Sequence, residues 1–221
     1  MNLPSNHLEQ IAFDGELDDF LSTNLTHFYQ ARTLLPEPDD QHSISHPRIG
    51  FSGVIDERLN LHLLDKMAEL RPEFQFILIG PVVRIDPSLL PVRENIHYLG
   101  KKNYYKLPQY VSGWDCAFLP FSFHEYDQVP NPTNIPEYLA AGKPVVSTSV
   151  PEMVHPYADA KLIYIADHPE HFVESIERAV NESSYDPEWL ERVDQYLESY
   201  KAPKPHIPAY MDSALKDIGI V

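Results

Sequence analysis

The sequence predicts an α/β fold: a Rossmann-like, mostly parallel sheet with helices on both faces. Short apolar runs that end in glycine or proline alternate with segments whose apolar residues recur every three to four positions. The short runs are apolar at consecutive positions, as in strands that are buried on both faces. Strands that alternate with helices across short loops are typical of parallel sheets with right-handed crossovers.

Each element follows from its own residues. Leu59, Leu63, Met67 and Leu70 have the spacing of one helix face. Residues 167–180 and 186–200 read as two late helices, the first opened by a capping box from Asp167 and the second capped at Asp186. The remaining expected helices are 104–111 and 135–141, and the six expected strands are 49–55, 74–80, 96–100, 116–121, 145–146 and 162–165.

Composition divides the chain into three parts. Residues 1–46 carry eight acidic side chains and one basic one, so they are expected to form an acidic leader or linker that is helical in parts, including 26–34. Residues 47–200 would form the Rossmann-like domain, and 201–221 a proline-rich linker and tail. A chain of 221 residues can hold one such domain but not two.

The charge and the sparse cysteine exclude several classes of protein. A net charge of −16 opposes binding to nucleic acid or to an anionic membrane surface. No apolar run approaches the roughly 18 to 20 residues of a membrane-spanning helix, and the start lacks the features of a signal peptide. The single cysteine, Cys116, lies in an apolar run and cannot form an internal disulfide. We therefore expect a cytoplasmic protein whose cysteine is a core thiol.

Residues 131–148 are the most informative stretch, because they read as a loop, a short helix and a buried strand. Asn134 suits an N-cap, Glu137 lies in the first turn, and Gly142 ends the helix. Backbone N–H groups at such a start favour a phosphate-bearing ligand. The same residues also fit a capping-box variant, in which the carboxylate folds back on the cap.

Residues 137–148, Glu-Tyr-Leu-Ala-Ala-Gly-Lys-Pro-Val-Val-Ser-Thr, resemble the donor-side motif of retaining glycosyltransferases with two Rossmann-like domains, the GT-B architecture. The likeness is to the family-4-like bacterial group that builds surface polysaccharides, and it covers about residues 27–165. It implies the donor-binding C-terminal half of an enzyme that transfers a hexose from a nucleotide-diphosphate sugar, UDP-sugar favoured, to a polysaccharide or lipid-linked acceptor. It implies no cofactor, and the scattered histidines predict no metal site.

The resemblance also assigns roles to residues. Glu137 would accept hydrogen bonds from the ribose hydroxyls, Gly53 and Arg58 would face the diphosphate, and Lys101 would assist there. The other expected donor-binding residues are Gly80, Pro81 and Gly100 near the base and Pro132, Thr133 and Asn134 at the helix start. Gly53 equally fits a plain strand–helix turn, and Arg58 a solvated first-turn residue.

The chain departs from the family pattern at two positions. Val129 stands eight residues before Glu137, where many such enzymes have a first glutamate, and Asn134 stands where the subgroup often has a lysine. Glu125 and Asp127 are the candidate catalytic acids that could replace the missing glutamate, although both also fit a solvated loop.

The acceptor-binding half has no counterpart in these 221 residues. Transfer would then require a second domain or a partner chain that closes the cleft. Two alternatives stay open: a catalytically degenerate module that regulates or assembles with an intact glycosyltransferase, and a fragment of a longer gene.

Overall fold

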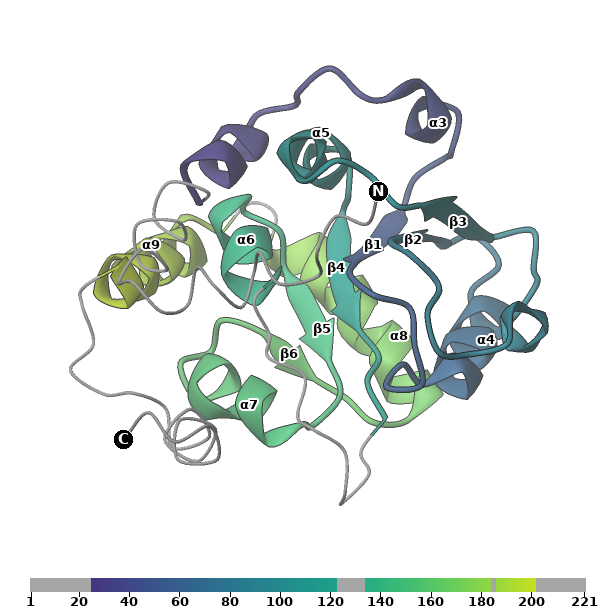
Figure 1. The fold of residues 1–221 in the computed structure, drawn as a ribbon. Coiled ribbons are helices and arrows are strands. Elements are labelled where there is room, and N and C mark those ends of the chain that lie inside the picture. Colours follow the sequence, from purple (N-terminus) through teal and green to yellow (C-terminus); the bar gives the residue numbers. More distant parts are fainter. Residues whose placement is uncertain (1–24, 123–133, 184–185, 202–221) are drawn as a thin grey trace, which may run out of the picture.

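The computed structural model describes residues 25–122, 134–183 and 186–201, and it contains a six-stranded sheet in which every pair is parallel (Figure 1). The strand order is β3-β2-β1-β4-β5-β6, as in doubly wound nucleotide-binding folds. The strands are β1 (Arg48–Ser52), β2 (Gln75–Ile79), β3 (Ile96–Gly100), β4 (Cys116–Leu119), β5 (Val145–Ser147) and β6 (Tyr164–Ile165). This confirms the predicted fold class.

The strand order reverses between β1 and β4. The chain builds β1, β2 and β3 outward in one direction and then returns to the other side of β1 for β4, β5 and β6. The loops after β1 and β4 therefore leave the sheet in opposite directions and open a crevice at the carboxyl ends of the strands. Ligands of open α/β sheets bind at this point.

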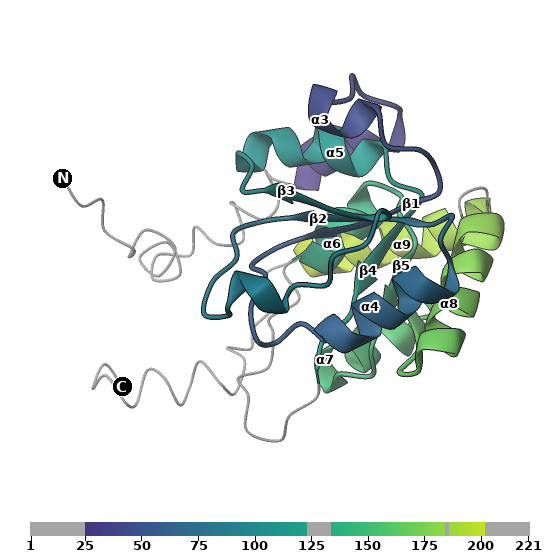
Figure 2. The same ribbon diagram turned by 90° about the vertical axis from the view of Figure 1, so that its right-hand side faces the viewer.

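Helices cover both faces of the sheet (Figures 1 and 2). α4 (Leu61–Leu70) and α8 (Pro169–Arg178) pack together on one face, while α5 (Leu107–Ser112), α6 (Asn134–Ala140) and α9 (Pro187–Lys201) lie on the other. The shorter elements are α3 (Asp39–His42), α7 (Pro151–Met153), the 3-10 turns η1 (Gln30–Arg32), η2 (Pro87–Leu89) and η3 (Tyr104–Lys106), and the wider turns η4 (Val154–Ala158) and η5 (Ala179–Ser183). No helix in the described ranges has the length and apolar character needed to cross a bilayer.

The predicted N-terminal cap is confirmed for α9 and wrong for α8. Asp186 caps α9 as predicted, since its Oδ1 accepts a hydrogen bond from the N–H of Glu188 at 2.9 Å. The predicted capping box at Asp167 is wrong, because His168 is the cap residue of α8 and makes no side-chain cap bond. Asp167 instead accepts from the N–H of Ser149 at 2.8 Å and joins the segments that follow β5 and β6.

The described part of the acidic N-terminal segment, residues 25–46, packs against the core. Residues 25–29 are helical, as the sequence pattern predicted, and continue into η1, with Leu25, Phe28 and Ala31 each 1% exposed. Gln41 is fully buried; its amide donates to the carbonyl of Tyr110 and accepts from Trp114 Nε1, both at 3.0 Å. Residue 46 therefore does not mark an edge of the hydrophobic core. Residues 1–24 and 202–221 of the predicted leader and tail lie outside the described ranges.

Candidate functional site

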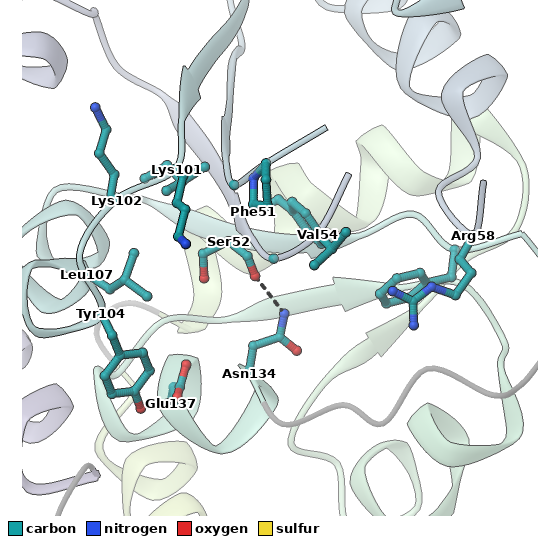
Figure 3. A pocket seen from close by; sticks show the side chains of 15 residues that line it. Phe51, Ser52, Val54, Arg58, Lys101, Lys102, Tyr104, Leu107, Asn134 and Glu137 are labelled. Atoms are coloured by element: carbon teal, nitrogen blue, oxygen red, sulfur yellow. Dashed lines mark hydrogen bonds between the residues drawn. The ribbon is translucent and has the colours of Figure 1, made fainter. Parts of the chain in front are cut away.

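A cavity of about 580 Å³ opens at the carboxyl ends of β1, β2 and β3, beside the start of α6 (Figure 3). This is the crevice where the strand order reverses, and its size suits a nucleotide-sized ligand. Seven of the residues predicted to bind the donor line it: Gly53, Arg58, Gly80, Pro81, Lys101, Asn134 and Glu137.

Glycines allow the loops after β1 and β2 to pack backbone against backbone. Gly80 has φ of +153°, and a Cβ there would lie 1.7 Å from the carbonyl oxygen of Gly53. The Gly53 N–H donates to the carbonyl of Ile79 at 2.9 Å, and the Gly80 N–H donates to the carbonyl of Gly100 at 3.0 Å. Gly100 does not line the cavity, but its carbonyl fixes the loop that does.

Glu137 and Tyr104 form one end of the cavity. The side chain of Glu137 is buried with a residue exposure of 9%, and Tyr104 Oη donates a hydrogen bond to its Oε1 at 2.5 Å. Burial raises the pKa of Glu137 to about 7, against the opposing effect of the Tyr104 hydrogen bond, which favours the charged form. Burial likewise raises the pKa of Tyr104, so its hydroxyl keeps its proton and remains a donor.

Asn134 ties the start of α6 to the end of β1. Its Nδ2 donates to the carbonyl of Ser52 at 3.0 Å (Figure 3). It also donates to the hydroxyl of Tyr138 at 3.2 Å. The N–H of Ser52 donates to the same tyrosine hydroxyl at 2.8 Å. The predicted N-cap role of Asn134 is wrong, because Asn134 is the first residue of α6 and its side chain acts here as a donor.

The basic residues at the cavity differ in whether they form ion pairs with protein carboxylates. Arg58 binds Asp56 through two nitrogens, with Nη2 at 2.7 Å and Nε at 2.9 Å, and the Nη2 of Arg84 adds a third contact at 3.1 Å. Burial raises the pKa of Asp56, but these hydrogen bonds outweigh it and hold the pKa below its ordinary value. Asp56 therefore stays ionised and retains both arginines.

Lys101 is the more available cation. Its neighbour Lys102 is paired with Asp40 at 2.5 Å, whereas Lys101 is exposed and has no carboxylate partner in the described part of the chain. Figure 3 shows Lys101 at the same end of the cavity as Glu137, with Arg58 at the opposite end. A ligand anion would thus meet an unpaired amine near Glu137 and a paired guanidinium far from it.

Some predicted site residues cannot be placed. The candidate catalytic acids Glu125 and Asp127, together with Pro132 and Thr133, lie outside the described residues, so their roles remain predictions. Within the described ranges, no three histidine, cysteine, aspartate or glutamate side chains gather as metal ligands would.

Sequence reasoning missed Asp56 and Tyr104. Both follow a strand by four residues, Asp56 after β1 and Tyr104 after β3, so their position was a usable signal. No local pattern links Tyr104 to Glu137, which is 33 residues away and comes into contact with it only in the folded protein.

The chain is similar in sequence to known proteins. The family model described as "Glycosyl transferases group 1" matches residues 46–182, more than half of the chain. A curated protein of Bacillus subtilis, the putative teichuronic acid biosynthesis glycosyltransferase TuaH, is 29% identical over 142 residues, which cover 61% of this chain and 35% of TuaH. The chain therefore spans about a third of the length of this relative.

Solved structures share the fold. Sucrose-phosphate synthase from Thermosynechococcus elongatus superposes with a TM-score of 0.55 at 15% identity, over 86% of this chain and 50% of that one. The C-terminal domain of the group 1 glycosyl transferase LpcC from Francisella tularensis gives 0.50 at 13% identity, over 76% of this chain and 97% of that domain.

Anabaena Alr3699/HepE, solved in complex with UDP and glucose, also superposes with a TM-score of 0.50, at 14% identity, over 79% of this chain and 54% of that protein. The likeness to the LpcC domain matches the prediction that the chain corresponds to the C-terminal half of a GT-B enzyme. Because this family model matches more than half of the chain, the chain belongs to the family of group 1 glycosyl transferases.

Proposed function

We propose that this chain binds a nucleotide-diphosphate sugar in the cavity between β1 and α6 and supplies the donor half of a hexosyltransferase. The observation that carries the proposal is that Glu137, a buried carboxyl group, and Lys101, an amine without a carboxylate partner among the described residues, lie at the same end of this cavity (Figure 3). A UDP-sugar is the favoured donor, in keeping with the UDP found in the Anabaena relative.

The cavity offers matching groups for the ribose, the diphosphate and the base of such a donor. Glu137, when ionised, presents only acceptors and suits the two hydroxyls of a ribose. Lys101 suits the diphosphate as a point charge. Gly80 and Pro81 also line the cavity, and their backbone groups suit contact with a planar base.

Transfer requires a second wall to the cavity. The chain spans about a third of TuaH and about half of the sucrose-phosphate synthase, so both proteins extend well beyond the part that is similar to this chain. A sugar acceptor must be held against the donor in a site that excludes water. We infer that an acceptor domain or a partner chain completes the enzyme, with a polysaccharide or lipid-linked sugar as acceptor.

The proposal is tested by isothermal titration of the folded protein with UDP, UDP-glucose, GDP and ADP. UDP and UDP-glucose are expected to bind, and Lys101→Ala should weaken both about tenfold, the value of one charged hydrogen bond. Lys106→Ala is the matched control, because it removes the same charge from the same loop at an exposed position that does not line the cavity. The absence of binding by every nucleotide at millimolar concentration would remove the proposal.

A non-catalytic role is the second candidate, and Asn134 favours it. The amide of Asn134 is committed to Ser52 and Tyr138 at the place where related enzymes often have a lysine for the donor phosphate. A module of this kind would bind the nucleotide without turning it over. Donor hydrolysis and UDP binding by wild type and Asn134→Lys test this candidate. Hydrolysis or tighter UDP binding gained with the lysine supports the loss of a phosphate contact at this position, whereas no gain of either removes the argument from Asn134.

A further inference from the structure

We infer that Tyr104 is a positioning residue for the donor: its hydroxyl holds the Glu137 carboxylate in the cavity in the form that accepts ligand hydrogen bonds. This inference rests on the proposed function and deepens it, since it concerns the same cavity. The contact that carries it is the 2.5 Å hydrogen bond from Tyr104 Oη to Glu137 Oε1.

The hydrogen bond divides the two oxygens of the carboxylate between the protein and the ligand. Oε1 accepts from Tyr104, whereas Oε2 has no hydrogen-bonding partner among the residues that the structure describes. Glu137 lines the cavity, and its Oε2 atom is not fully buried. Oε2 is therefore the oxygen that a bound hydroxyl group can reach.

Tyr104 is itself fixed by contacts outside the cavity. Its ring packs edge-on against that of Phe28, with centroids 6.1 Å apart, and Asn103 caps the turn by accepting from the N–H of Tyr105 at 3.0 Å. Lys102, the residue before Asn103, donates a hydrogen bond from its Nζ to Oδ2 of Asp40 at 2.5 Å. The hydroxyl of Tyr104 is thus placed by the N-terminal segment as well as by its own turn, as a positioning role requires.

The pair also sets the charge of the cavity. Burial disfavours the ionised form of Glu137, and the donated hydrogen bond from Tyr104 is the contact that opposes it. The other titratable groups at the cavity are Lys101 and Lys102 after β3 and Arg58 after β1, while Tyr138 on the same helix bonds to Ser52. Of these contacts, only that of Tyr104 reaches the carboxylate directly within the described residues.

The test is a pH profile of UDP-glucose binding between pH 6 and pH 8.5. This ligand is chosen because its diphosphate is a diester and does not titrate in that range. The wild-type affinity is expected to rise about tenfold across pH 7 as Glu137 becomes ionised, following its pKa of about 7. Tyr104→Phe keeps the ring and removes only the hydroxyl, so the midpoint should move to higher pH. Affinity at pH 7 should then fall by up to about fivefold, the difference between the midpoint and the low-pH limit of a tenfold profile.

Three further variants complete the experiment. Glu137→Gln should flatten the profile, and Tyr104→Phe added to Glu137→Gln should change it no further, because the two act as one unit. Tyr105→Phe is the matched control, since the neighbouring tyrosine is 70% exposed and does not line the cavity.

The outcomes separate this inference from the function on which it rests. Wild-type binding with a Tyr104→Phe profile that coincides with wild type would overturn the positioning role and leave donor binding intact. A uniform loss of affinity in Tyr104→Phe at every pH would also overturn it, because that is the signature of a structural defect alone. No binding by the wild type would overturn both.

Discussion

At the scale of single residues, the candidate site is where the chain departs from ordinary packing. A carboxyl group is buried at Glu137 with one hydrogen-bond donor, although burial of a charge is unfavourable unless it is fully paired. Asn134 and Tyr138, by contrast, satisfy each other and Ser52. The carboxylate of Glu137 thus lines the cavity with one oxygen that has no partner within the described residues, as expected of a residue kept for a ligand and not for stability.

Glu137→Gln is expected to stabilise the protein at high pH. The pKa of Glu137 is raised to about 7 in the folded state, so its favourable contribution is complete below about pH 4.5 and is lost as pH rises through 7. The variant does not ionise, and its free energy of unfolding at pH 8 should exceed that of wild type by about 2 to 3 kcal/mol, a gain that disappears near pH 4.5.

Urea denaturation of both proteins at pH 4.5, 6 and 8 measures this difference. Glu174→Gln, at an exposed position on α8, is the control and should show no such trend. Equal stability of Glu137→Gln and wild type at pH 8 would show that the carboxylate is not destabilised by burial.

At the scale of elements, the sequence located most of the helices and strands but not how some of them begin. Period-three-to-four spacing found α4, α8 and α9, because each buries one continuous face against the sheet or another helix. The start of α8 was misassigned since Asp167 has a tertiary partner, the N–H of Ser149, that no local pattern records. β6 was expected to span residues 162–165 but has only two residues. Leu162 and Ile163 are apolar and buried, as in a strand, yet they lie outside the hydrogen-bonded ladder.

Asn60 is expected to cap α4. Its Oδ1 accepts from the N–H of Leu63 at 2.9 Å and satisfies one of the donors at the helix start. Asn60→Ala should lower the free energy of unfolding by about 1 kcal/mol, while Asn60→Asp, which keeps the acceptor, should lie close to wild type. Equilibrium denaturation measures both, and an equal loss in the two variants would contradict a capping role.

At the scale of the whole molecule, the N-terminal segment is part of the structure that supports the cavity. Glu37 pairs with the buried Arg48 at 2.6 Å, Gln41 bonds to Trp114, and Asp40 anchors Lys102 next to Lys101. These contacts run from residues that sequence composition assigned to a leader to β1, α5 and the loop after β3. The segment therefore couples the packing of the core to the geometry of the site.

A chain that begins at residue 46 is expected to lose its stable fold. It removes Leu25 and Phe28 from the core, at about 1.5 to 3 kcal/mol each, and leaves Arg48, 3% exposed, without its carboxylate. Thermal unfolding followed by circular dichroism should show a melting temperature far below that of the full chain, or no cooperative transition. A melting temperature within a few degrees of the full chain would show that residues 25–45 are dispensable.

Gln41→Ala is a milder test of the same packing. It leaves Trp114 Nε1 and the carbonyl of Tyr110 buried without their partner and should lower stability by about 2 to 3 kcal/mol. Gln195→Ala, at an exposed position on α9, is the matched control and should be nearly neutral.

The sequence by itself determined the fold class, the family and seven of the fifteen residues that line the cavity. Buried parallel strands are apolar throughout, and strand ends converge on one edge of such a sheet, so local patterns are enough to place Gly53, Gly80, Lys101 and Glu137 near one another. Only the tertiary structure decided which charges are free and which are paired. The contacts of Tyr104 with Glu137, Arg58 with Asp56 and Lys102 with Asp40 depend on side-chain placement that periodicity does not encode, and two of the three join residues more than thirty positions apart.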